Sequence, residues 1–401
     1  MMMVEDLQQV FKEAVRAHEQ EEFFRAVDLY GKILRQYPDA DIVLYNQGLA
    51  LYELGRFAEA GEAFRSAAAI RGDDADTWFN LALSLKQQGR YTEACRIYER
   101  ALMLQPDNVD ILYNLANCCR EDNRLDEAAR WYEKVLELQP DHLAAINNLA
   151  GLCHRRGELE RARSLYHRIL YFRPGHPGAL HMLAALEGSV REAPPTEYVR
   201  DLFDHYSDHF DQSLLEKLEY RVPELLFDLC CRFPVQDGYR NCLDLGCGTG
   251  LAGLAFRTLC LRLAGVDLSK KMVDQARDKN VYDELADGDV VEFLNNCPER
   301  FDLFVAADVL TYLGELQPLF QAVADRSLPD ARFVFSTEHG ENREPGWLIR
   351  STGRFAHHPE YIARMVEQSG GRLLCSEPAD LRREGEAWIR GDIYLVEFPG
   401  S

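Results

Sequence analysis

Small and aromatic residues recur along the first half of the chain with a period of 34 positions. Alanine occupies one position of this period, at Ala26, Ala60, Ala94, Ala128 and Ala162. An aromatic residue follows each alanine by four positions, at Tyr30, Phe64, Tyr98, Tyr132 and Tyr166. Residues four apart share one face of an α-helix, and a fixed period of this length is typical of repeated structural units. The pattern therefore predicts a repeated helical unit.

Turn-forming residues divide each period into two helices. The middle of the period holds a residue that tolerates the left-handed backbone of a tight turn, namely Gly55, Gly89, Asn123 or Gly157. Most periods end in proline, at Pro38, Pro106, Pro140 and Pro174, and Gly72 takes the remaining place. We therefore predict five helix hairpins over residues 7–176, followed by a closing helix at about 178–187.

The unit at residues 75–108 resembles a tetratricopeptide repeat. The matching residues are Trp78, Leu81, Ala82, Leu85, Gly89, Tyr91, Ala94, Tyr98 and Pro106. The resemblance implies an all-α superhelix over residues 7–187 whose inner helices form a concave surface for a protein or peptide partner.

An asparagine column lies on the predicted inner helices, at Asn46, Asn80, Asn114 and Asn148. A primary amide donates and accepts hydrogen bonds, so a ladder of amides can pair with an extended peptide backbone. The alternative is that these amides bond to neighbouring helices. Aromatic residues precede three of them, at Tyr45, Phe79 and Tyr113. These rings either contact a partner or pack between repeats.

The second half of the chain has a different pattern. Residues 188–197 contain Pro194-Pro195 and break the helical periodicity, which is typical of a linker. From Asn241 onward, short apolar runs alternate with helical segments, which indicates an α/β domain over residues 198–401. Candidate strands lie at 241–245, 262–267, 288–291, 301–306, 331–337, 371–376 and 391–398, with a helix near 359–369.

A glycine-rich loop follows the first candidate strand, in the run Leu243-Asp244-Leu245-Gly246-Cys247-Gly248-Thr249-Gly250. Glycines let a backbone turn sharply and approach a ligand closely. A dinucleotide fingerprint places its third glycine one position later, where this chain has Leu251. The carboxylate of Asp244 repels a pyrophosphate and can help to hold the ammonium group of an amino-acid cofactor. This combination favours S-adenosylmethionine over NAD.

A second carboxylate, Asp267, ends the next candidate strand. At the carboxyl edge of a parallel sheet, an acid in this place can accept both ribose hydroxyls. The glycine loop together with Val266-Asp267-Leu268-Ser269 resembles class I S-adenosylmethionine-dependent methyltransferases. More narrowly, the chain resembles bacterial methyltransferases fused to tetratricopeptide repeats, through 203–211, 218–223, 307–313 and 351–357.

The resemblance implies a Rossmann-like seven-stranded sheet with a reversed final hairpin. It also implies cofactor contacts from Cys247 and Leu268 within the two motifs, and from Asp289 to the adenine amino group. Tyr206 and Phe210 share one helix face, so they are expected to close over the cofactor as a lid that Tyr220 and Arg221 complete. The alternative is a helix that packs on the edge of the sheet.

The acceptor side is expected where the fourth and fifth strands end, because ligands bind at that edge of an α/β sheet. Asp308 and Tyr312 follow the fourth strand, beside the glycine loop, and the Tyr312 ring can face the sulfonium. Glu338 and His339 follow the fifth strand, and Arg354, His357 and His358 precede the last large helix. His339 or His357 is the candidate base. The run Arg382-Arg383-Glu384 is interpreted as solvated ion pairs.

Composition narrows the range of partners. The formal net charge of −21 opposes binding to nucleic acid or to an anionic membrane. The eleven cysteines show neither zinc-ligand spacing nor a disulfide framework. We expect no metal site, reduced cysteines and, in the absence of a signal-peptide pattern at the first residues, a cytoplasmic protein.

Three hypotheses remain for the whole chain. In the first, an active methyltransferase uses the repeat array to recruit a protein or peptide acceptor. In the second, the enzyme methylates a small molecule or natural product, and the repeats serve assembly. In the third, the chain is an adaptor with an inactive methyltransferase-like domain. Intact Asp244, Gly246, Gly248 and Asp267 argue against the third hypothesis.

Overall fold

The computed structural model describes residues 2–189, 193–206, 211, 214–215, 218–236, 238–341, 344–384 and 387–399, without the side chains of residues 2–6, 201, 205 and 206. The chain forms two compact units, residues 1–174 and 175–401. No helix in the described part of the chain is both long enough and apolar enough to cross a membrane.

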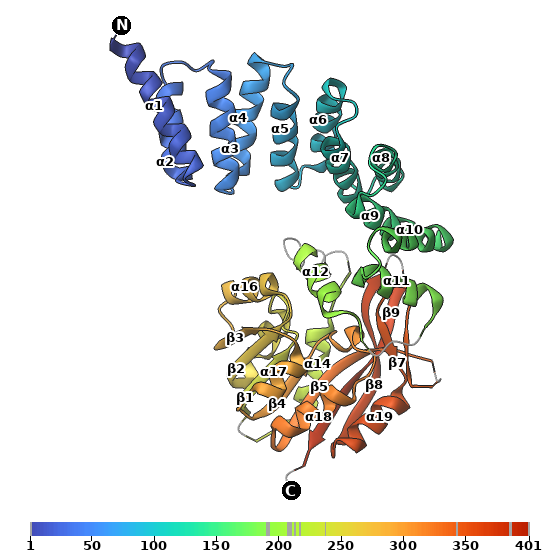
Figure 1. Ribbon diagram of the computed structural model, residues 1–401. Helices are drawn as coiled ribbons and strands as arrows, with labels where there is room; N and C mark the ends of the chain where they lie inside the picture. Colours follow the sequence, from blue (N-terminus) through green and yellow to red (C-terminus); the bar gives the residue numbers. More distant parts are fainter. Residues whose placement is uncertain are drawn as a thin grey trace. The chain divides into compact units, whose positions relative to one another are not determined.

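The first unit is a series of five helix hairpins, as the 34-residue period predicts (Figure 1). The hairpins are α1 (Met2–Glu19) with α2 (Phe23–Leu34), α3 (Asp41–Glu53) with α4 (Phe57–Ile70), α5 (Ala75–Gln87) with α6 (Tyr91–Leu104), α7 (Val109–Glu121) with α8 (Leu125–Leu138), and α9 (Leu143–Arg155) with α10 (Leu159–Phe172). The repeated alanines are completely buried, and the repeated aromatic rings are at most 3% exposed. The four predicted turn residues all have a positive φ.

The second unit begins with α11 (Pro177–Glu187), the closing helix that the sequence pattern places with the repeats. Apolar residues lie on all sides of this helix, and its buried side chains include His181 and Ala185. Ala185 belongs to the core of the α/β domain, and the His181 ring contacts Tyr198 of the next helix, α12 (Thr196–Tyr206). The compact units divide before this helix, whereas the sequence pattern places the helix with the repeats. The predicted domain boundary after residue 187 therefore stays a prediction.

The sheet of the second unit contains nine strands in the described part of the chain, where the resemblance implies seven. The strands are β1 (Tyr239–Leu245), β2 (Cys260–Asp267), β3 (Glu284–Asp287), β4 (Phe301–Ala306), β5 (Ser327–His339), β6 (Trp347–Ile349), β7 (Phe355–His357), β8 (Arg372–Glu384) and β9 (Ala387–Phe398). The two additional strands, β6 and β7, have three residues each, too few for a recognisable alternation of burial.

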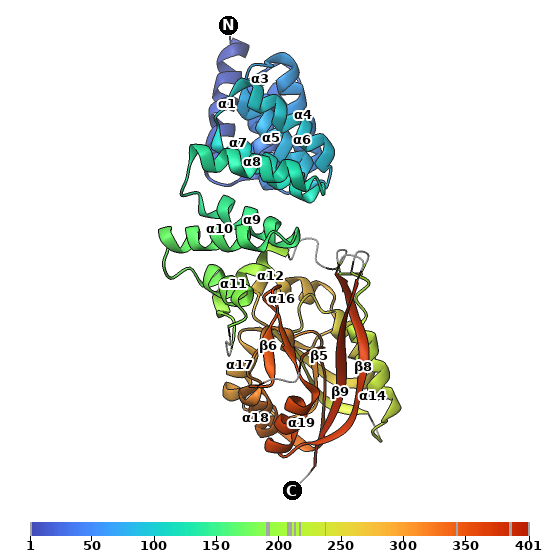
Figure 2. The same cartoon turned by 90° about the vertical axis from the view of Figure 1, so that its right-hand side faces the viewer.

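The strand order is β3-β2-β1-β4-β5-β7-β6, and β1 to β5 are parallel. The expected reversed hairpin is present, because β9 pairs antiparallel with both β5 and β8 (Figure 2). The prediction of a strand at 288–291 is wrong. The strand β3 ends at Asp287, and α17 (Val290–Asn296) begins within the predicted range. The Asp289 side chain caps this helix by accepting hydrogen bonds from the amides of Val291 and Glu292.

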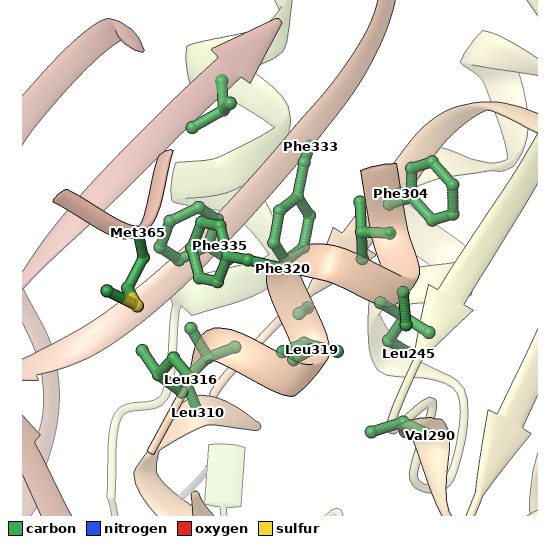
Figure 3. Close-up of a cluster of buried hydrophobic side chains, with 14 of the residues drawn as sticks. Leu245, Val290, Phe304, Leu310, Leu316, Leu319, Phe320, Phe333, Phe335 and Met365 are labelled. Atoms are coloured by element: carbon green, nitrogen blue, oxygen red, sulfur yellow. The ribbon is translucent and has the colours of Figure 1, made fainter. Parts of the chain in front are cut away.

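Helices cover both faces of the sheet. On one face, α17, α18 (Gln317–Arg326) and α19 (Pro359–Gln368) pack on a cluster whose rings Phe320, Phe333 and Phe335 lie close together (Figure 3). On the other face, α14 (Val222–Arg232) and α15 (Leu251–Phe256) pack on a second apolar cluster. With both faces covered, the carboxyl edge of the parallel strands is the place where a ligand can approach.

Candidate functional site

A cavity of about 220 Å³ lies at the carboxyl edge of the parallel strands. The residues predicted from the sequence that line it are Tyr220, Gly246, Cys247, Gly248, Asp267, Leu268, Asp289, Asp308, Tyr312 and Arg354. The structure thus brings the glycine loop and the Asp267 motif together with side chains from four further segments of the chain.

The glycine loop connects β1 to α15 in an unusually close turn. Gly246 has φ +66°, and a Cβ atom at this position would lie 2.5 Å from Cγ2 of Val309. Gly248 has φ +53° with no heavy atom within 4 Å of the position of a Cβ atom, so its backbone is open to an approaching ligand. Gly246 therefore has to be glycine because a side chain would not fit there. Both Gly246 and Gly248 also adopt a backbone conformation that favours glycine.

Asp267 organises this loop as well as the end of β2. Its Oδ2 atom accepts a hydrogen bond of 2.8 Å from the Gly248 amide, and its Oδ1 atom accepts one of 2.9 Å from the Ser269 amide. Burial raises the pKa of the Asp267 carboxyl, while these two amides lower it. Because a carboxylate oxygen can accept more than one hydrogen bond, each of the two oxygens can still accept one from a ligand diol in the cavity.

Asp244 lies behind the loop and is 1% exposed, and it is not among the described residues that line the cavity. The Tyr282 hydroxyl donates a hydrogen bond of 2.6 Å to its Oδ2 atom, and its Oδ1 atom is buried without a partner in the described part of the chain. Burial raises the pKa of Asp244 to about 7. Because this oxygen is enclosed behind the loop, a direct contact between Asp244 and the ammonium group stays a prediction.

Segments before the sheet also reach this edge. The Ser269 hydroxyl donates to Asp204 of α12 at 2.5 Å, and the Thr249 hydroxyl donates to Asp211. Lys279 adds an ion pair of 2.7 Å with Asp211. Of the predicted lid, Tyr220 is buried at the cavity, whereas Arg221 is exposed and does not line it. The Tyr206 side chain and Phe210 lie outside the described residues.

Both candidate bases lie away from the cavity. The His339 side chain is 53% exposed, and its Nδ1 atom is 2.7 Å from Asp392. His357 is completely buried, its Nε2 atom is 3.0 Å from the carbonyl oxygen of Gly314, and burial lowers its pKa to about 4. Neither ring is placed to take a proton from a molecule in the cavity, so the geometry gives no support to a catalytic role for them.

The interpretation of Arg382 as a solvated residue is wrong. Arg382 is 1% exposed, lines the cavity, and binds both carboxylate oxygens of Asp308 at 2.7 Å. It also forms an ion pair with the buried carboxylate of Glu338. Leu381 forms a bulge in β8, which interrupts the alternation of the two faces and turns both Leu381 and Arg382 into the interior. An alternating pattern does not predict this.

The asparagine column is partly engaged inside the repeat array. The Asn80 amide donates to the Tyr45 hydroxyl at 3.0 Å, and the Asn148 amide donates to the Tyr113 hydroxyl at 3.2 Å. Asn114 donates to the Asp110 carbonyl of its own helix. Asn46, like the other three, is half-buried. These contacts agree with the alternative in which the amides bond to neighbouring helices, and they leave the amide oxygens as acceptors.

No group of three or more potential metal-ligating side chains lies together among the described residues. All eleven cysteines are free thiols, and most of them are buried. Cys95 and Cys119 lie within the repeat array with their sulfur atoms 3.6 Å apart.

Comparison with protein families identifies both parts of the chain. Residues 11–75, 73–141 and 120–186 match models of the tetratricopeptide repeat, and residues 243–335 match a model described as a methyltransferase domain. The last repeat match includes α11, although this helix packs within the second unit. The chain thus carries a tetratricopeptide-repeat array followed by a methyltransferase domain.

Relatives with described activities match only part of the chain. The ubiquinone biosynthesis O-methyltransferase of Coxiella burnetii (strain Dugway 5J108-111) is 25% identical over 154 residues, which cover 34% of this chain and 64% of the relative, less than two thirds of its length. Nodulation protein S of Rhizobium tropici is 32% identical over 108 residues, 25% of this chain and 44% of the relative. The crystal structure of the N-methyltransferase NodS from Bradyrhizobium japonicum WM9 with S-adenosyl-L-homocysteine has 20% identity and a TM-score of 0.37, covering 44% of this chain and 86% of that one.

Proposed function

We propose that this chain, in which tetratricopeptide repeats precede a methyltransferase domain, transfers a methyl group from S-adenosylmethionine to a protein or peptide that the repeats recruit. The observation that carries this proposal is the cavity at the carboxyl edge of the sheet, where the glycine loop and Asp267 meet. We also propose that the chain acts in the cytoplasm, as expected of a sequence whose eleven cysteines lack the spacing of a disulfide framework.

The residues of the cavity fit this cofactor from end to end. Asp267 would accept the ribose hydroxyls, Asp289 with Leu268 would border the adenine, and the open backbone of Gly248 would lie against the amino-acid portion. When bound, S-adenosylmethionine supplies a methyl group on a positively charged sulfur. The protein contributes mainly position, because a collinear arrangement of nucleophile, methyl group and sulfur can supply roughly 7–11 kcal/mol of the barrier. Tyr312 and Phe203, whose rings are 5.1 Å apart, would exclude water at that place.

Calorimetry on the full-length chain tests the choice of cofactor. We expect S-adenosylmethionine to bind and NAD not to bind, because a pyrophosphate against the glycine loop would face the carboxylate of Asp267, which lines the cavity. Gly246→Ala should abolish the binding, since the added Cβ atom would overlap Val309. Binding of NAD alone would overturn the proposed activity.

Asn114→Ala tests the recruiting role of the repeats. Because the Asn114 amide bonds only within its own helix in the described structure, alanine should leave the stability of the array unchanged. If the amide oxygen accepts a hydrogen bond from a bound peptide, transfer of labelled methyl groups to cellular protein should fall about fivefold. Glu62→Ala, an exposed residue of α4, is the control. Labelling that enters only small molecules would favour a small-molecule acceptor instead.

A further inference from the structure

A cluster of charged side chains adjoins the cavity, and three of its members, Asp308, Arg354 and Arg382, line it. Asp308 follows β4, Glu338 is the last residue but one of β5, Arg382 lies on β8, and Arg350 and Arg354 precede β7. Asp308 adopts a left-handed conformation with φ +62°, which costs about 1 kcal/mol or more for a residue other than glycine. Nη1 of Arg382 donates to both carboxylate oxygens of Asp308, and this ion pair stabilises the side chain at that position.

The charges of this cluster do not cancel. Arg382 binds Asp308 and Glu338, and the second carboxylate oxygen of Glu338 is 3.0 Å from Nε of Arg350. Two carboxylates are therefore matched by two guanidinium groups. Arg354 is the third guanidinium group; it takes part in none of these ion pairs, although Asp308 and Glu338 lie near enough to raise its pKa.

Arg354 is nevertheless a fixed cation at the cavity. It is half-buried and lines the cavity, close to Tyr312, which also lines it. Although burial opposes its charge, Tyr312, Asp308 and Glu338 raise the pKa of the guanidinium. The preceding residue is also held, because the carbonyl oxygen of Gly353 lies 2.8 Å from Nε2 of the buried His181 of α11. The guanidinium thus projects from an anchored loop.

The strand order places Arg354 at the acceptor end of the cavity. Along the edge from β3 to β7, the lining residues are Asp289, Asp267, the glycine loop, Asp308 with Tyr312, and finally Arg354. Asp267 and the glycine loop would hold the ribose and amino-acid portions of the cofactor. A cation beyond them, on the far side of β4, therefore faces the molecule that receives the methyl group.

Among the described residues, the usual general bases are absent from this end of the cavity. Neither histidine nor lysine is among the described residues that line it. Asp308 is the carboxylate at this end, and both its oxygens are bound by Arg382. Burial and the negative charge of Asp308 raise the pKa of Tyr220. A hydroxyl or ammonium acceptor would have to lose a proton here, whereas a carboxylate would not.

We propose that the group methylated is a carboxylate, held against Arg354; this inference rests on the proposed methyl transfer. One carboxylate oxygen forms a bond to the methyl carbon as the bond between that carbon and sulfur breaks, and the bonding electron pair stays with sulfur. The products are a neutral methyl ester and a neutral thioether, and no proton is released. Because opposite charges disappear together, exclusion of water from the cavity favours the step, and Arg354 retains the ester oxygens through its N–H donors.

The product tests the proposal directly. Full-length protein is incubated with S-adenosylmethionine carrying a labelled methyl group and with a cell extract, and the products are treated with dilute base. A methyl ester then releases labelled methanol, whereas a methyl ether or methylamine keeps the label. Methanol release that falls about 10- to 100-fold in Arg354→Gln supports the proposal. Label that remains stable to base overturns it.

A binding measurement separates this proposal from the proposed activity. Full-length protein saturated with S-adenosylhomocysteine, which cannot transfer a methyl group, is titrated with carbon-13-labelled acetate and followed by NMR line broadening. We expect binding to the unmodified protein and to Arg232→Gln, whose guanidinium pairs with Glu377 on the surface, but not to Arg354→Gln. Equal binding to both variants, or none to the unmodified protein, overturns the carboxylate site. Acetate binding without any labelled product would contradict the methyl transfer alone.

Discussion

Replacing Arg382 by methionine is expected to lower the free energy of unfolding of the second unit by about 3–5 kcal/mol, the usual cost of leaving a buried carboxylate without its partner. The side chain is 1% exposed, and its loss would leave Glu338, itself 2% exposed, with Arg350 alone. Asp308 would lose both of its hydrogen bonds to the guanidinium and keep a left-handed conformation. Hydrogen exchange of the β5 and β8 amides in the full-length chain measures this loss.

The loss in free energy of unfolding caused by Arg382→Met should become smaller as the pH falls. Burial already raises the pKa of Glu338 above its ordinary value, and Arg382 opposes this effect. Without Arg382, the folded protein takes up protons at a higher pH than the unfolded chain does, so the stability of the variant rises as the pH falls. The difference from the unmodified protein should therefore shrink between pH 7.5 and 5.5.

Arg383→Met is the matched control for this prediction. Arg383 is the next residue of β8, is 37% exposed, and pairs with Glu219 on the surface. Surface ion pairs contribute about 0–1 kcal/mol, so this variant should remain close to the unmodified protein. If both variants lose the same stability, the cluster at Asp308 does not stabilise the fold.

The arrangement of the repeats was predictable from the sequence, because each hairpin is made of residues close together in the chain. The burial of Ala94 and Tyr98 follows from a period that repeats five times. The surface on which α11 packs was not predictable from a repeat of this kind. Its apolar residues lie on all sides, and no local pattern states whether such a helix packs on the preceding repeat or on the sheet that follows.

The part of the cavity lined by the glycine loop and Asp267 was also predictable, because these residues lie at the ends of strands. Gly246, Gly248 and Asp267 occupy the carboxyl edge that an α/β pattern defines. The part of the cavity near Asp308 depends on contacts between distant segments. Arg382 reaches Asp308 across 74 positions of sequence, through a bulge that alternation does not reveal. For the same reason, the residues around His357 in the sequence do not reveal that its ring contacts the Gly314 carbonyl in the interior.

Asp267→Ala is expected to weaken the binding of S-adenosylmethionine by a factor of about 100 or more. Two hydrogen bonds from the ribose hydroxyls to a carboxylate contribute about 1.5–3 kcal/mol each, and every 1.4 kcal/mol is a factor of about ten in affinity. The variant would also release the amides of Gly248 and Ser269, which loosens the glycine loop. Calorimetry with the full-length chain measures the affinity.

A ligand without ribose hydroxyls separates these two effects of Asp267→Ala. The unmodified protein should bind S-adenosylhomocysteine far more tightly than an analogue that lacks both hydroxyls, and the variant should bind the two ligands almost equally. Asp287→Ala provides the control, because Asp287 pairs with Asp267 on the neighbouring strand but is exposed and outside the cavity lining. If Asp267→Ala still discriminates between the two ligands, the carboxylate acts only on the loop, and the ribose lies elsewhere in the cavity.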